Sequence, residues 1–318
     1  LTARVQALAG GDIMIALDQA VRDYLTLRRS LGFKIESYDH WLAGFVAHLE
    51  SDGQRFITAA AALRWATQLG GSLTTKAKRL AAVRKFAEYV RTLDPRTEVP
   101  APDLIPYRTE RYRPRLYSPG DVRALLHAAR QLRGFMSETY PAFVGLLAVT
   151  GMRAGEALCL DRHDFDGREG ILLIRKAKFG KSRLVPLHKT TVAALLAYAL
   201  KRDQAFPRPR SPAFFLSQAG TRLLRENVWQ TFTCLRRRTG LLGPRGCRPR
   251  LHDLRHSFAV QTLIGWYRAG VDVEARLPIL STYLGHVNPS NTYWYLTATP
   301  ELVGLAAQRL EHKLGGLP

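Results

Sequence analysis

The sequence predicts a two-domain protein that is mainly α-helical and carries one small antiparallel β-sheet in its second domain. The chain has 318 residues, which is long for a single compact domain. Over most of the first ninety positions, apolar residues recur with a period near 3.6, as they do in amphipathic helices. Two short apolar runs within residues 170–186, separated by a turn, predict the strands. Because 46% of the residues are hydrophobic, a sizeable core can form.

The first domain, residues 1–93, is predicted to contain four helices. Glycines at positions 32, 53, 70 and 71 interrupt the periodic pattern, and the helices between them are Ile13–Ser30, Ser37–Glu50, Thr58–Gln68 and Thr74–Leu93. The last helix has a basic face, so its cations are candidate contacts for a polyanion such as DNA: Lys76, Lys78, Arg79, Arg84 and Lys85.

A proline-rich linker is predicted over residues 94–114, since prolines favour an extended chain there. The second domain, residues 115–318, begins with a helix in which Ser118 is the N-cap, Pro119 the first helical residue and Asp121 part of the first turn. Helices follow at 136–149 and 150–160, then the strands, and helices again from 190 onward. The last is a tail helix at 300–314 with an apolar stripe of Leu302, Leu305, Ala306, Leu310 and Leu314.

The charge of the chain indicates an anionic partner. Lysines and arginines total 47 against 26 acids, a net charge of +21. Residues 1–110 carry +3 of this charge and the remainder +18. Such an excess favours nucleic acid over a merely basic soluble protein. The sequence contains no run of about 20 apolar residues, so no membrane span is expected. No secretory signal is evident. The three cysteines show no C-x-x-C spacing, which fits a reducing cytoplasm.

The segment TGMRAGEALCL, residues 150–160, predicts a phosphate-binding turn. Gly151 permits a tight turn that places Arg153 near a helix N-terminus, where free backbone N–H groups and a guanidinium together suit a phosphate. Glu156 lies three residues later on the same face and can orient the arginine. An ordinary surface Arg–Glu pair is the alternative interpretation.

The segment ILLIRKAKFGKSRLVPL, residues 171–187, predicts a basic hairpin. Its tip carries Lys178 and Lys181, in a shape that can enter a DNA groove, and Arg183 follows as a further candidate DNA contact. A solvated run of charge is the alternative.

A third motif, LHDLRHSFA at residues 251–259, places His252 and Arg255 three residues apart on one helix face. His252 and His256 also have the four-residue spacing of a zinc-binding HExxH motif. Asp253 in place of glutamate and the cation of Arg255 both argue against zinc.

The fourth motif is TYLGHVNPSNTYWYL, residues 282–296. Gly285 turns the chain, His286 follows in the loop, and Asn288 is predicted to cap a short helix. On that helix Tyr293 and Tyr295 would point about 200° apart, so only one of them can face the same site as the motifs above.

Taken in order, these motifs resemble those of the tyrosine recombinase, or phage integrase, family. The resemblance covers residues 115–298, and the helical module before them is similar to the core-binding domain of that family. It implies two arginines that clamp a scissile phosphate, a hairpin lysine, a general acid–base histidine, a second histidine that hydrogen-bonds the phosphate, and a tyrosine nucleophile. The matching residues here are Arg153 and Arg255, Lys178 (with Lys181 as the alternative), His252, His286, and Tyr295, which lies nine residues after His286.

For function, the resemblance implies site-specific DNA cleavage and rejoining through a 3′-phosphotyrosine, with Lys178 protonating the leaving 5′-oxygen and with no metal, cofactor or ATP. The two domains would form a C-shaped clamp on double-stranded DNA. Two copies would bind each site, four would exchange strands through a Holliday junction, and other recombinases of the same element are further candidate partners. A cytoplasmic, nucleoid-associated bacterial protein is expected, and YLTLRRSLGFKI favours a mobile element.

Two other functions are compatible with parts of this pattern. A type IB topoisomerase or a telomere resolvase would use the same chemistry, and relaxation of DNA at a single site without synapsis would identify the topoisomerase. A basic protein without catalysis would bind DNA in a salt-sensitive way and form no covalent adduct.

Overall fold

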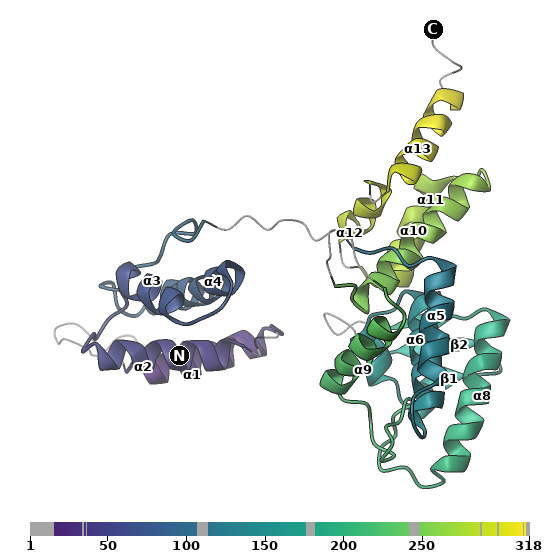
Figure 1. Cartoon of the computed structure of the whole chain (residues 1–318). Helices are drawn as coiled ribbons and strands as arrows, with labels where there is room; N and C mark the ends of the chain where they lie inside the picture. Colours follow the sequence, from purple (N-terminus) through teal and green to yellow (C-terminus); the bar gives the residue numbers. More distant parts are fainter. Residues whose placement is uncertain are drawn as a thin grey trace. The chain divides into compact units, whose positions relative to one another are not determined.

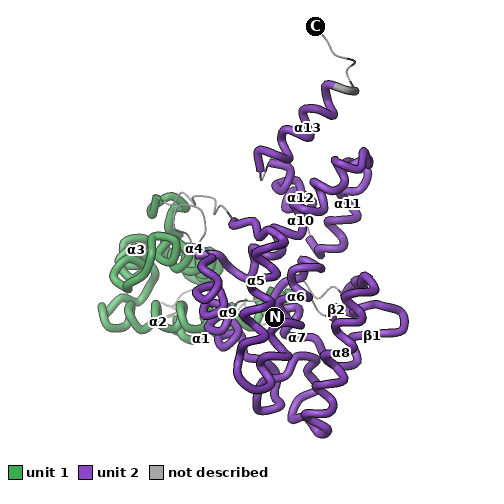
Figure 2. The backbone as a smooth tube through the Cα atoms, turned by 45° about the vertical axis from the view of Figure 1, so that its right-hand side comes forward, with its two compact units in different colours: residues 1–111 green, residues 112–318 purple. Residues whose placement is uncertain are grey.

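The computed structural model describes residues 16–33, 35, 37–106, 114–175, 182–241, 248–286, 288–297, 299–313 and 315. The chain divides into two compact units, residues 1–111 and 112–318, which are coloured separately in Figure 2. Each unit has its own hydrophobic core. Among the described residues, no helix is both long and apolar enough to cross a bilayer.

The first unit contains the four predicted helices, purple to blue in Figure 1: α1 (Leu17–Ser30), α2 (Tyr38–Ser51), α3 (Ala59–Gln68) and α4 (Leu73–Val90). Two of them begin at side-chain caps, since Thr58 accepts a hydrogen bond from the N–H of Ala61 and Ser72 from that of Thr75. Their apolar faces meet in a core around Phe45, Val46, Trp65, Phe86 and Val90.

Residues 94–106 differ from the expected linker, because the structure places them in the first unit. The N–H of Glu98 donates to the carbonyl of Ile57 at 2.8 Å, and its carboxylate accepts from the N–H of Ala59 at 2.8 Å. Ile105 is buried in the same core. Prolines therefore keep this stretch non-helical without making it independent of the helices, as its apolar residues still find a surface to cover.

The second unit begins as the sequence predicts. Ser118 caps α5 (Pro119–Arg130) by accepting from the N–H of Asp121, whose carboxylate accepts in return from the N–H of Ser118. The helices that follow are α6 (Met136–Thr150), α7 (Ala154–Cys159), α8 (Lys189–Ala205), α9 (Arg225–Arg238), α10 (His252–Arg268) and α11 (Val273–Leu284).

A three-stranded antiparallel sheet stands between α7 and α8 in the chain. Strands β1 (Phe165–Asp166), β2 (Ile171–Ile174) and β3 (Arg183–Pro186) lie in that spatial order. In the hairpin, Ile174 pairs with Arg183 and Leu172 with Val185. Alternate residues of β2 are buried against the same core as α8, which confirms the predicted small sheet.

The C-terminal part of the second unit forms a further core. It brings together α10, α11, α12 (Ser290–Tyr293), the 3₁₀ turn η5 (Trp294–Thr297) and α13 (Pro300–Lys313). Its buried residues include Leu263, Leu280, Leu284, Tyr295 and Leu302. The turn η5 is thus fixed between α10 and α13, which determines the position of Tyr295.

Candidate active site

Arg153 lies at the N-terminus of α7 because Gly151 ends α6 in a left-handed conformation, with φ of 60°. A side chain at Gly151 would also collide with Phe258, since a Cβ there would lie 2.5 Å from its ring. The Arg153 guanidinium donates to Glu156 at 2.8 Å and to the carbonyl of Gly285 at 3.1 Å. Glu156 orients the arginine as the sequence predicts.

Arg255 is buried, with 2% of its surface exposed. Its guanidinium donates to the carbonyl of Gly151 at 3.0 Å and to that of Leu284 at 2.8 Å. No carboxylate among the described residues forms an ion pair with it. Burial lowers the pKa of Arg255 to about 10, and the nearby charge of Arg153 acts in the same direction. The guanidinium remains charged at neutral pH, so an anion is the group that this site lacks.

The buried tyrosine of the pair is Tyr295. Only 2% of its surface is exposed, whereas Tyr293 is 53% exposed, so the two do point to different sides as predicted. Burial raises the pKa of Tyr295, and the charge of Arg255, a hydrogen bond from Arg255 and the charge of Arg153 all oppose that rise. The same arginines would stabilise a phenolate, the reactive form of the side chain.

Two of the predicted histidines flank this tyrosine region. The ring of His286 stacks on that of Tyr295 with centroids 6.1 Å apart, and its Nδ1 lies 2.7 Å from Oγ1 of the buried Thr292. His252 is the first residue of α10 and is an exposed residue, although the surrounding protein atoms desolvate its ring in part. His256, one turn later, lies between the rings of His252 and Tyr295, at 4.8 and 5.5 Å.

All three histidines are held neutral. Burial lowers the pKa of His252 to about 4, that of His286 to about 4 and that of His256 to about 3. The charge of Arg255 contributes to each of these shifts. A neutral imidazole can accept a proton, which is what a general base requires.

These shifts predict that the folded protein loses stability as the pH falls from about 6.5 toward 5. The folded pKa values lie below the unfolded value, so in this interval the unfolded chain binds protons that the folded chain does not, and unfolding is favoured. Thermal denaturation of the DNA-free protein in steps of pH measures the effect. His256→Gln removes one such group and should make the dependence shallower, whereas an unchanged pH dependence in that variant would contradict the prediction.

The lysines of the hairpin, Lys178 and Lys181, lie outside the described residues. Arg183, expected as a DNA contact, has another environment: its side chain is 12% exposed and forms an ion pair with Glu156 at 2.8 Å. Its Nε also donates to the carbonyl of Tyr283 at 2.9 Å. It therefore belongs to the interior of the site, a location that its basic sequence neighbourhood did not reveal.

On α4 the five basic candidates divide into two groups. Arg79 donates to the carbonyls of Leu69 and Gly70 beyond the end of α3, and Lys85 forms an ion pair with Glu88. The others are exposed or half-buried: Lys76, Lys78 and Arg84. The latter three remain the stronger candidates for phosphate contacts.

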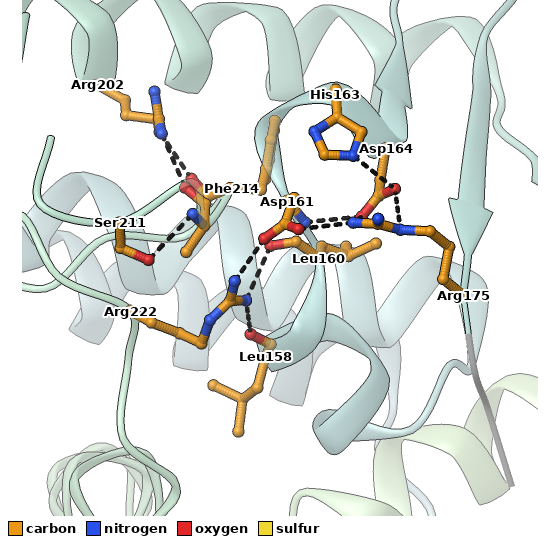
Figure 3. A network of polar contacts seen from close by, with 11 residues as sticks. Leu158, Leu160, Asp161, His163, Asp164, Arg175, Arg202, Ser211, Phe214 and Arg222 are labelled. Carbon is orange, nitrogen blue, oxygen red and sulfur yellow. Dashed lines mark hydrogen bonds and ion pairs between the residues drawn. The ribbon is translucent and has the colours of Figure 1, made fainter. Parts of the chain in front are cut away.

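A second polar network lies at the other end of α7, as Figure 3 shows. Asp161, His163 and Asp164 come close enough together to share a cation. Arg175 however bonds to both aspartates, at 2.6 and 2.7 Å, and Arg222 pairs with Asp161. Because guanidiniums already neutralise these carboxylates, the network fixes the start of the sheet and does not suit a metal ion.

Comparison with known proteins identifies the family of this chain. The sequence profile described as "Phage integrase family" matches residues 117–301. The chain belongs to that family. An integrase/recombinase of Sinorhizobium fredii, y4rB, is 44% identical over 94% of this chain and 98% of its own length. The tyrosine recombinase XerD of Mycobacterium tuberculosis is 31% identical over 88% of this chain and 92% of its own length.

The fold agrees with this assignment. The site-specific recombinase XerH, in a structure with its difH substrate after cleavage, superposes with a TM-score of 0.64 at 20% identity, covering 94% of this chain and 83% of that one. Site-specific DNA recombination is thus the activity of this phage integrase family member, and tyrosine recombinases are DNA strand-exchange enzymes.

Sequence reasoning missed part of the site. It singled out neither Thr292, which bonds to His286, nor the backbone carbonyls of residues 283–285, which accept hydrogen bonds from arginines. Carbonyl groups leave no trace in sequence except the glycine that ends the helix. Gly285 was the available signal, since it marks the C-terminus of α11.

Proposed function

We propose that this recombinase cleaves DNA by attack of Tyr295 on a phosphodiester held by Arg153 and Arg255. The observation that carries the proposal is the buried guanidinium of Arg255, which among the described residues donates to two carbonyls and to Tyr295 and forms no ion pair with a carboxylate. Its charge opposes the rise that burial causes in the pKa of Tyr295. A scissile phosphate would supply the missing negative charge. As the pentacoordinate transition state develops more charge, two guanidiniums stabilise it further.

The remaining roles are those that the resemblance to tyrosine recombinases implies, and with them the atoms of the step balance. The bond from the Tyr295 oxygen to phosphorus forms while the bond from phosphorus to the 5′-oxygen breaks, which leaves a 3′-phosphotyrosine and a 5′-hydroxyl. Neutral His252 accepts the phenolic proton, and His286 hydrogen-bonds the phosphate. Lys178 donates the proton to the 5′-oxygen. Because the phosphodiester energy is retained in the adduct, rejoining to a new strand requires no ATP.

A nicked substrate tests this proposal. When the strand beyond the cleavage position is only a few nucleotides long, it diffuses away after cleavage and the covalent complex accumulates. We expect a protein–DNA adduct that survives boiling in detergent. Binding without any adduct would leave the protein a DNA-binding module and remove the proposal.

For assembly, we propose that two copies bind each recombination site and that two sites join in a tetramer which exchanges strands through a Holliday junction. Other recombinases of the same mobile element are candidate partners. The tail helix supports assembly only in its second half. Leu302 is fully buried against its own unit and Leu305 half-buried, so the stripe is not free as a whole, whereas Leu310 is 58% exposed.

This division predicts the effect of truncating the chain after Arg309, which keeps the hydrogen bond from Arg309 to the carbonyl of Val271. The truncation keeps Leu302 and Leu305 but removes Leu310, whose burial on a neighbour would contribute roughly 1.5–3 kcal/mol. We expect unchanged thermal stability and single-site binding, with fewer synaptic tetramers on native gels. Leu302→Ala is the contrasting variant, since it should lower the melting temperature of the monomer. Normal synapsis by the truncated protein would show that the tail serves only its own unit.

A further inference from the structure

Three arginines converge on the C-terminal end of α11. Each donates a hydrogen bond to one of three successive carbonyls, at 2.9, 2.8 and 3.1 Å: Arg183 to Tyr283, Arg255 to Leu284, and Arg153 to Gly285. Two of them are the proposed phosphate clamp, and the third comes from strand β3.

The end of a helix is suited to this arrangement. Its last carbonyls have no partner within the helix and carry the negative end of the helix dipole, which favours cations. Gly285 ends α11 with φ of 68°, and a Cβ there would lie 2.8 Å from Nη1 of Arg183. Glycine therefore both turns the chain and leaves the room that the guanidinium of Arg183 occupies.

Glu156 joins the same group of side chains. Its two oxygens accept from Nη1 and Nη2 of Arg183 at 3.1 and 2.8 Å, and from the side chain and N–H of Arg153 at 2.8 and 2.9 Å. Burial raises the pKa of Glu156, but the hydrogen bonds and charge of Arg183, followed by the hydrogen bonds from Arg153, outweigh it and hold the pKa below its usual value.

We propose that Arg183 is a positioning residue for the arginine clamp and not a DNA contact. It keeps Glu156 ionised and in place, and Glu156 in turn orients Arg153 toward the phosphate. Arg183 also pairs with Ile174 across the hairpin. It therefore connects strand β3, which follows the proposed Lys178 in the chain, to the arginine clamp. This inference rests on the proposed function, since it assigns how the clamp of that function is held.

Arg183→Met and Arg222→Met form a matched pair of variants. Arg222 likewise bonds to backbone carbonyls, of Leu158 and Leu160, and to a carboxylate, but it lies at the far end of α7 (Figure 3). For Arg183→Met we expect cleavage of the nicked substrate to slow by about 10- to 100-fold, the scale of a misplaced reacting group. Arg222→Met should cleave at the normal rate.

DNA binding separates positioning from contact. Loss of a phosphate contact weakens binding and lowers the dependence of log affinity on log salt by about one. We expect Arg183→Met to leave both the affinity and this slope unchanged. A weaker affinity with a smaller slope, or a normal cleavage rate, would overturn the proposal.

The pH profile of cleavage gives a readout that a general loss of structure would not move. Without Arg183, the pKa of Glu156 rises, so the acid limb of the rate profile should shift to higher pH in Arg183→Met. Arg183→Lys keeps a charge but loses the paired geometry, and should be intermediate. In a Glu156→Gln background, Arg183→Met should slow cleavage little further, because Arg183 acts through Glu156. Additive losses would contradict that mechanism.

One measurement needs no catalysis. The ¹⁵Nη1 resonance of Arg153 in the DNA-free protein reports the hydrogen bond from Nη1 to Glu156, and it should move in Arg183→Met but stay in place in Arg222→Met. If the wild-type protein forms no adduct, the proposed function fails, and this resonance still decides whether Arg183 positions Arg153. An unmoved resonance would overturn the inference even in an active enzyme.

Discussion

Replacing Tyr295 with phenylalanine is expected to abolish the covalent DNA adduct. The variant lacks the one oxygen that can bond to phosphorus, so the loss should be about 10⁴-fold or more, as when a nucleophile is removed from other enzymes. Binding should remain nearly normal, because the phenylalanine ring fills the same buried position between His256, Trp294 and His286. Adduct formation on a nicked substrate and mobility shifts on the intact site measure the two quantities.

Tyr293→Phe is the control for this experiment. Tyr293 lies two residues away and is exposed, so its hydroxyl can be removed without disturbing the site. We expect the normal amount of adduct. If Tyr293→Phe lost the adduct and Tyr295→Phe kept it, the nucleophile would be the other tyrosine and the register of the site would be wrong.

The sequence predicts different roles for Tyr293 and Tyr295 because the geometry of a short helix allows only one of them to face the site. Two residues two positions apart on a helix cannot face one site. The resemblance to the tyrosine recombinase family, in which the nucleophile lies nine residues after the second histidine, then favours Tyr295. The N-cap of α5 at Ser118 and the turn at Gly151 are predictable for a similar reason, since each depends on local chemistry alone. Tyr295 itself lies in the 3₁₀ turn η5 and not in α12, because the ends of short helices are set by tertiary contacts.

The environments of the arginines could not be predicted in this way. Arg153, Arg183 and Arg255 are far apart in sequence, and nothing local distinguishes a buried guanidinium from one that contacts solvent or DNA. Arg183 stands in a basic hairpin, so its neighbourhood indicates DNA, but the structure pairs it with Glu156. The first part of the expected linker, residues 94–106, illustrates the same point. Local proline content does not reveal that residues 94–106 lie against a core.

Burial also changes what removal of Arg255 should do. From the motif alone, Arg255→Ala would slow chemistry and scarcely affect folding. The structure shows that Arg255 is the donor for two carbonyls. Leaving these acceptors without a partner costs about 1–3 kcal/mol each in the interior, so the alanine variant should also have a lower melting temperature. A slow reaction in the alanine variant would therefore not distinguish loss of the phosphate clamp from loss of structure.

Arg255→Lys provides the cleaner test and the second large effect. Lysine keeps a positive charge in the buried site but cannot donate from a planar fork to the carbonyls and the phosphate together. We expect cleavage to fall by about 10² or more, the scale for losing one donor to a developing oxyanion, with a smaller fall in melting temperature than for alanine. Arg153→Ala, at a position that is 26% exposed, should slow cleavage on the same scale with little effect on folding.

The same argument predicts that cleavage needs no metal ion, because two guanidiniums already supply the positive charge around the phosphate. Activity of the wild-type enzyme should survive excess chelator. If chelation stopped cleavage and added Mg²⁺ or Zn²⁺ restored it, the arginine clamp would not be the main source of charge stabilisation. Near-normal cleavage by Arg255→Lys would show instead that a positive charge at this position suffices and that the paired hydrogen bonds of the guanidinium are not required.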